Sequence, residues 1–202
     1  MRNLKTIALL LLPLLGCFAQ LEDQSVTIKH SLCGASGPDC VPGSGASLTI
    51  VQVSGSNTFT VNFGDQPLFK PSTALGPATL NTSLLINQAA FDMTTTGSGA
   101  DFSGVNTAQV LAAPRQSTGP GDDPCATPAN CPVLAAYNKA TDGAATRHLA
   151  LKGNGSDIVK LIDQTTHQII IEITASGTAP TPALWNADVS MDMGLNSRAN
   201  FP

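Results

Sequence analysis

The chain has 202 residues and a formal net charge of −4 at pH 7, and only 12% of its residues are charged. The sequence holds no basic run, so we expect no nucleic-acid partner. Aromatic residues make up 4% of the chain, while glycine, threonine, serine and alanine are abundant. This composition is typical of exported β proteins and unsuited to a helical bundle.

The chain begins with a leader. Arg2 and Lys5 give it a positive start, and an apolar run follows over residues 7–15. A membrane-spanning helix needs about 20 apolar residues, so a run this short predicts a secretory signal.

The leader ends in Leu-Leu-Gly-Cys at residues 14–17, which resembles the lipobox of bacterial lipoproteins. The resemblance implies that residues 1–16 are removed and that Cys17 is acylated, so that a membrane becomes a partner through the anchor. Because the next residue is Phe18 and not aspartate, it also implies the outer membrane. The alternative is ordinary cleavage after Ala19, which would release a secreted or periplasmic protein that starts at Gln20.

The five cysteines leave an odd one in an exported protein, and lipidation of Cys17 would leave four. Cys33 and Cys40 have six residues between them, and Cys125 and Cys131 have five. Both pairs lie in loops rich in glycine and proline, so we predict the local disulfides 33–40 and 125–131, although four cysteines allow three connectivities. A zinc site is less favoured, because neither spacing is Cys-x2-Cys.

The mature chain predicts one domain over residues 25–202, after a polar tether over residues 17–24. Its first half alternates as strands do. Within residues 79–95 the alternation slips between Ile86 and Phe91, which indicates a bulge or two successive strands. The strands expected in this half span residues 25–32, 47–53, 58–63 and 79–95.

The second half holds two segments, residues 105–113 and 133–140, whose identity as helix or strand the pattern leaves open. Residues 133–140 resemble a short helix, and Ser156 is placed to cap a helical turn that ends at Ile162. Further strands are expected over residues 147–152, 167–174 and 184–195. In the last two, alternate apolar residues share one face, namely Ile169, Ile171 and Ile173, and then Trp185, Ala187, Val189, Met191, Met193 and Leu195.

These short strands predict an all-β fold, an antiparallel two-sheet β-sandwich that is Ig-like or jelly-roll-like, with one to three short helices in its connections. A closed barrel is the alternative.

Residues with chemical potential are few, and no cofactor is expected. His30 and His167 fall on apolar strand faces and are weak candidates for a metal site, since no metal-binding histidine spacing occurs. Asp188 and Asp192 share the polar face of one strand, roughly 13 Å apart, which is far for an acid–base pair. Asp122–Asp123 and residues 154–157 could bind calcium, but turns or caps are the simpler interpretation.

No nucleophile motif or phosphate-binding loop is present. We therefore expect a lipid-anchored envelope protein whose domain is structural or binds another protein, and is not an enzyme. The alternative is an extracytoplasmic module that binds a carbohydrate or a metal ion. An enzyme would need a cleft with a carboxylate pair or a His–Asp contact.

Overall fold

The computed structural model describes residues 19–33, 40–42, 58–65, 69–94, 99–118, 122–178, 180 and 186–200. Side chains are not described for 19–33, 40–42, Leu75 and Asn186. The lipobox, the strand expected at 47–53, Trp185 and the side chains of Cys33 and Cys40 therefore lie outside the described part, and the expectations for them stay predictions.

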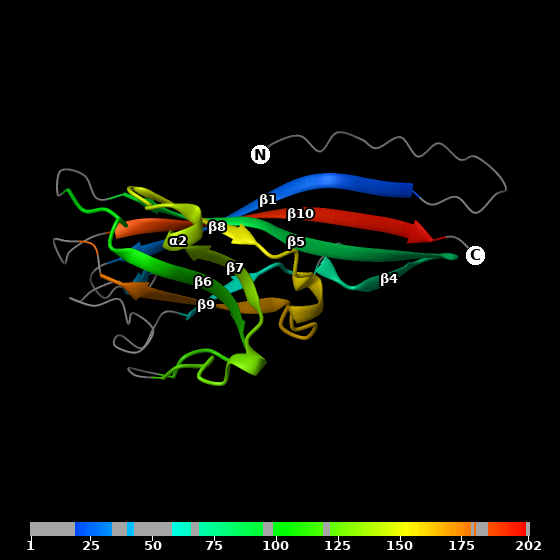
Figure 1. Ribbon diagram of the computed structural model, residues 1–202. Coiled ribbons are helices and arrows are strands. Elements are labelled where there is room, and N and C mark those ends of the chain that lie inside the picture. Colours follow the sequence, from blue (N-terminus) through cyan, green and yellow to red (C-terminus); the bar gives the residue numbers. More distant parts are fainter. Residues whose placement is uncertain are drawn as a thin grey trace.

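Within the described residues the structure is mostly β, with one short α-helix and short 3-10 turns (Figure 1). The helical elements are η2 (Pro128–Asn130), α2 (Lys139–Asp142) and η3 (Ile158–Leu161). The strands are β1 (Ala19–Cys33), β2 (Cys40–Pro42), β3 (Thr58–Asn62), β4 (Ser72–Leu75), β5 (Ala78–Met93), β6 (Val105–Ala113), β7 (Val133–Asn138), β8 (His148–Gly153), β9 (Gln168–Gly177) and β10 (Asn186–Asn200).

Hydrogen bonds join all ten of these strands into one sheet, where the sequence predicted two. Its order is β2-β1-β10-β5-β8-β7-β6-β9-β3, with β4 paired to β5, and only the β1–β2 pairing is parallel. Figure 1 shows β1, β10 and β5 along the top and β6 and β9 below them. Side chains from β3, β9 and β6 join those of β5 and β10 in a single apolar core, so this core lies inside the folded-over sheet.

The predicted slip in the long strand β5 is a β-bulge. Asp192 of β10 pairs with Gln88, whereas the next residue, Met193, pairs with Ile86, so that Asn87 is the extra residue. Leu84 and Ile86 before the bulge and Ala89, Phe91 and Met93 after it are all buried. The bulge moves the apolar residues back to the core face after the change of parity.

Residues 105–113 are the strand β6, and most of residues 133–140, whose identity the sequence left open, are also a strand and not the short helix they resemble. Residues 133–138 form the strand β7, which lies between β6 and β8. A short apolar run fits a helix or a strand equally well, and here neighbouring strands supply the backbone hydrogen bonds. A helix begins only at Lys139, where Asn138 Oδ1 accepts a hydrogen bond from Ala140 N–H (2.9 Å).

Two other local expectations need correction. Strand β1 begins at Ala19, so residues 19–24 are not a free tether but extend the sheet along β10, with Ala19 opposite Ala199. The cap of η3 is Asp157 and not Ser156, because Asp157 Oδ1 accepts from Val159 N–H (3.2 Å). Within the described part, no helix is both long and apolar enough to cross a membrane.

Candidate functional site

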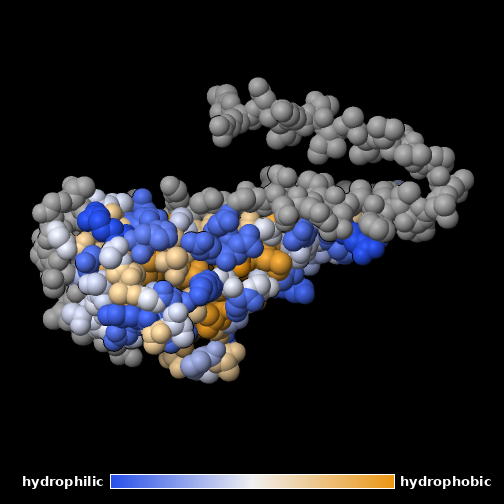
Figure 2. Space-filling view, turned by 45° about the horizontal axis from the view of Figure 1, so that its top comes forward, coloured by the Kyte–Doolittle hydropathy of each residue, from blue (hydrophilic) through white to orange (hydrophobic). Residues whose placement is uncertain are grey.

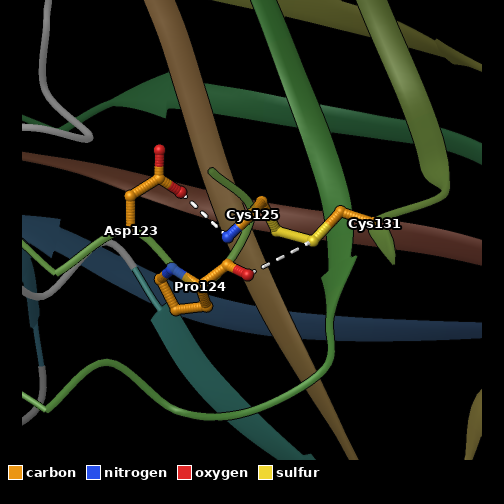
Figure 3. The surroundings of a disulfide bond; sticks show 4 residues. All are labelled: Asp123, Pro124, Cys125 and Cys131. Carbon is orange, nitrogen blue, oxygen red and sulfur yellow. Dashed lines mark hydrogen bonds between the residues drawn. A yellow bond between two sulfur atoms is a disulfide. The ribbon is translucent and has the colours of Figure 1, made fainter. Parts of the chain in front are cut away.

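The predicted disulfide between Cys125 and Cys131 is present, with an S–S distance of 2.09 Å and a Cα–Cα distance of 5.5 Å (Figure 3). The short turn η2 between the two cysteines brings their backbones together, since Cys131 N–H donates to the carbonyl of Pro128 (3.1 Å). The disulfide fixes one end of the segment formed by the described residues 115–118 and 122–132, which we call the disulfide loop.

The disulfide loop covers the outer face of the sheet, opposite to the main core. Cys125 and Cys131 are buried there against Leu111 and Ala113 of β6, and Val133 and Ile170 pack on the same cluster. This second small apolar cluster explains why both faces of β6 are largely buried.

Polar contacts also fasten the disulfide loop. The Arg115 guanidinium donates to both carboxylate oxygens of Asp122 (2.7 and 2.9 Å), and this pairing lowers the pKa of Asp122 to about 2. Ser117 N–H donates to Thr58 Oγ1 on β3 (3.2 Å). The turn interpretation of Asp122–Asp123 is thus confirmed: Asp123 Oδ1 accepts from Cys125 N–H (2.8 Å; Figure 3).

Beneath this loop lies Glu172 of β9, whose exposed fraction is 0%. Neither of its carboxylate oxygens accepts a hydrogen bond from a protein donor. It pairs in register with Leu111 on one side and with Thr58 on the other, so it occupies the middle of the covered surface. Buried carboxylates without donors are rare, because burial strongly disfavours the charged form.

The pKa of Glu172 is raised from 4.5 to about 7. Burial is the largest cause of the raised pKa, and the nearby carboxyl group of Asp123 is the next. The negative charges of Asp123 and Asp122 raise the pKa further, while the Cys125 N–H opposes the shift. The pKa of Glu172 thus lies close to neutral pH.

The sequence pattern does not single out Glu172 as a buried residue. The alternation in Ile-Ile-Ile-Glu-Ile-Thr places it opposite to the core-facing isoleucines, a position that reads as solvent-exposed. The one available signal was a lone glutamate in a run of isoleucines. Since Glu172 is sealed from solvent, its carboxyl group cannot reach a substrate in this conformation.

A second site is a polar groove of about 450 Å³, to which β5, β10 and η3 contribute. Five amide or hydroxyl side chains line it together with Asp157, Lys160 and Arg198. Thr82 of β5 pairs with Ser197 of β10, and their hydroxyl groups lie 3.3 Å apart. This pair is on the same face of the sheet as the buried pair of Leu84 and Leu195. We call this site the polar groove.

Asp157 fixes one wall of the polar groove. Its Oδ1 accepts from Leu84 N–H (3.0 Å) as well as from Val159 N–H, and its Oδ2 lies 3.6 Å from the ammonium group of Lys160. The Lys160 side chain is 73% exposed. The groove thus combines hydroxyl and amide groups with a positively charged rim, which suits a polar ligand that carries an anionic group.

His30 and His167 do not lie on neighbouring strands. His167 is not in β9 but in the preceding turn, at φ 58°, with Nε2 3.9 Å from Asp65 Oδ1. His30 lies on β1 and pairs with Val189 of β10. In the sheet order, β10 is five strands away from β9, the strand that follows His167. Within the described residues, no group of three histidine, cysteine or acidic side chains could hold a metal ion.

A closer His–Asp contact occurs between His148 Nδ1 and Asp92 Oδ1 (2.6 Å). Both side chains are more than half exposed on the outer face of β5 and β8. Asp188 pairs with Asp92 in register, and Asp192 pairs with Gln88, so the two predicted strand carboxylates lie on the same open surface. None of these four residues lines the polar groove.

No protein-family model and no curated protein sequence matches this chain. Among solved structures, it is distantly similar to the VP1 protein of Trichodysplasia spinulosa-associated polyomavirus in complex with GM1 oligosaccharide, at 9% identity and a TM-score of 0.30, covering 89% of this chain and 95% of that one. It is also similar to the decameric BFDV capsid protein, at 10% identity and a TM-score of 0.28, covering 92% and 99%. Scores this low establish no shared function.

Proposed function

We propose that this chain is a lipid-anchored protein of a bacterial outer membrane, held through acylated Cys17, and that its β domain works by binding and not by catalysis. The Leu-Leu-Gly-Cys sequence at residues 14–17 carries this proposal. Only Phe18 separates Cys17 from the first residue of β1, so an acyl anchor would hold the domain close to the lipid surface.

The non-catalytic part of the proposal rests on where the acidic groups lie. Among the described residues, the carboxyl group whose pKa is raised to near neutrality is that of Glu172, which is fully buried beside the disulfide loop. The His148–Asp92 contact lies on an open surface, where solvent would surround any bound substrate. These features favour a binding or structural role at the envelope, with another envelope protein as the partner.

The surface supports a polar mode of contact. Among the described residues, Leu161 is the only large hydrophobic side chain that is exposed, at 37%. Figure 2 shows hydrophilic side chains over most of the described part of one face, with smaller apolar areas between them. We also infer a sandwich-like architecture of the Ig or jelly-roll kind, which the single core inside the folded-over sheet supports.

The test is the intact mass of the full chain, purified from membranes of a diderm bacterial host. We expect a mature N-terminus at Cys17 that carries acyl mass, and release of the Cys17→Ala variant from the membrane. Phe18→Asp is the matched control, since it keeps the lipid but should move the protein to the inner membrane. A soluble chain that starts at Gln20 would overturn the anchor and the location together.

A second candidate function is binding of a small polar ligand in the polar groove, favoured by its volume of about 450 Å³ and its charged rim. An acidic saccharide fits this lining, because hydroxyl and amide groups bind sugar hydroxyls and Lys160 or Arg198 would bind the carboxylate. Titration of acidic and neutral saccharides, followed by NMR, tests this function. Binding that is weakened by Lys160→Ala but not by Lys139→Ala, outside the groove, supports it, and no shifts at the groove would exclude it.

A further inference from the structure

The polar groove lies at the end of the sheet where β1 begins. Ala19, the first residue of β1, pairs with Ala199 of β10. The next pair, Gln20 with Arg198, already reaches the groove, because Arg198 lines it. Asn81 of β5 pairs with Arg198 on the other side and lines the groove as well. Figure 1 shows the start of β1, the start of β5 and the end of β10 together at one end of the sheet.

Little chain separates this end of the sheet from Cys17. From Cys17 to Ala19 the chain runs for two residues, which span at most about 7 Å. Strand β10 contributes residues 196–198 to the groove, and these lie one to three residues from Ala199, or about 3–10 Å along the strand. The headgroup layer on each side of a bilayer is about 5–8 Å thick. An acyl anchor at Cys17 would therefore hold the groove at the level of the lipid headgroups.

Two buried hydroxyl groups line the polar groove and are not fully used by the fold. Thr82 is 6% exposed and Ser197 is 2% exposed. Their hydroxyl oxygens lie 3.3 Å apart, so that one O–H donates to the other oxygen. The second O–H has no acceptor among the described residues. Because buried polar groups normally have a partner, this donor is available to a bound ligand.

The charged side chains of the polar groove suit an anionic ligand. The carboxylate of Asp157 is engaged by the protein, since its Oδ1 accepts from Leu84 N–H and Val159 N–H. Its Oδ2 lies 3.6 Å from the Lys160 ammonium group, which is longer than a hydrogen bond, and the Lys160 side chain is 73% exposed. Arg198 is the second cation of the lining. The lining thus has one more positive than negative charge, which favours a phosphate group.

We propose that the polar groove binds the headgroup of an anionic phospholipid, with the phosphate beside Lys160 and Arg198 and the headgroup hydroxyls beside Thr82 and Ser197. The proposal rests on the acyl anchor, which brings the groove to the lipid surface. It gives the domain a second attachment to the membrane and so fixes the orientation of the sheet on that surface. An acidic saccharide offers the same charge, but the anchor does not concentrate it at the groove.

The first test titrates the full chain, purified in mild detergent from a diderm bacterial host, with phosphatidylglycerol or phosphatidylethanolamine and counts bound lipids by native mass spectrometry. We expect phosphatidylglycerol to bind more tightly, and Lys160→Ala to weaken its binding about fivefold. Lys152→Ala is the matched control, because Lys152 is 78% exposed and also pairs with an aspartate, Asp142, but lies outside the groove. Equal binding of the two lipids, or equal losses in the two variants, would overturn the proposal.

The second test distinguishes a lipid from a free ligand. Glycerol 3-phosphate or galacturonate is added to the complex with phosphatidylglycerol, and we expect the lipid to stay bound at an equal concentration of either competitor. Displacement by one of them would overturn the proposal in favour of a free ligand, an acidic saccharide in the case of galacturonate. A denaturing mass spectrum of the same sample reports the covalent acyl group at Cys17, so the anchor and the lipid site can fail separately.

Discussion

The hydroxyl group of Tyr137 joins the end of β7 to the turn that follows α2. It donates a hydrogen bond to the carbonyl of Gly143 (2.6 Å) and accepts one from Ala145 N–H (3.2 Å). Tyr137 is 4% exposed, so these bonds satisfy a buried polar group and two backbone groups at once. The side chain therefore fixes the path of the chain from α2 into β8.

Tyr137→Phe should lower the free energy of unfolding by about 1–2 kcal/mol, because the ring still fills the core while the two backbone groups lose their partner. Chemical denaturation measures the change. Thr141→Ala, which removes an exposed hydroxyl that donates to the Asn138 carbonyl, is the control and should cost less. Equal losses in the two variants would mean that the Tyr137 bonds do not matter.

Replacing both Cys125 and Cys131 by alanine should destabilise the domain by about 2 kcal/mol, the value expected from chain entropy for so short a loop. Some packing is also lost, since both sulfur atoms contact the cluster on the outer face. Thermal unfolding under oxidising conditions measures this effect. If the variant and the wild type unfold at the same temperature, the disulfide does not stabilise the loop.

Glu172→Gln should change the dependence of stability on pH. The pKa of Glu172 in the folded protein, about 7, lies above the ordinary value of 4.5. The folded state therefore binds the proton more tightly, and the wild type loses stability as the pH rises from 4.5 through 7. We expect the stability of the variant relative to the wild type to rise by about 1–3 kcal/mol from acid to mildly alkaline pH.

Denaturant unfolding at several pH values measures that difference. Asp92→Asn serves as the control, because it removes an exposed carboxylate elsewhere on the sheet. A difference between Glu172→Gln and the wild type that does not change with pH would contradict the raised pKa.

Gly153→Ala should be strongly destabilising, by about 3 kcal/mol or more. A Cβ at Gly153 would come within 1.9 Å of the Ile86 carbonyl oxygen and within 2.7 Å of that of Asn87. These are backbone atoms at the β5 bulge, so they cannot rotate away. Thermal unfolding compares this variant with Gly194→Ala, whose Cβ would meet only the Asn87 side chain at 3.1 Å. Similar melting temperatures for the two would show that the bulge can shift.

Sequence alone determined the features that depend on neighbours along the chain. The alternation in β9 and β10 predicts which side chains face the core, and the slip in β5 predicts its bulge, because a strand alternates with a period of two whatever its partners are. The short spacing of Cys125 and Cys131 likewise predicts their pairing.

Only the tertiary structure decided the features that depend on what covers a face. Residues 133–138 are a strand because β6 and β8 flank them, and β1 begins at Ala19 because β10 offers it a long partner. The alternation of β9 marks Glu172 as exposed, but the disulfide loop covers it. Periodicity separates the two faces of a strand, whereas the solvation of each face, and hence the charge of Glu172, depends on contacts between residues distant in sequence.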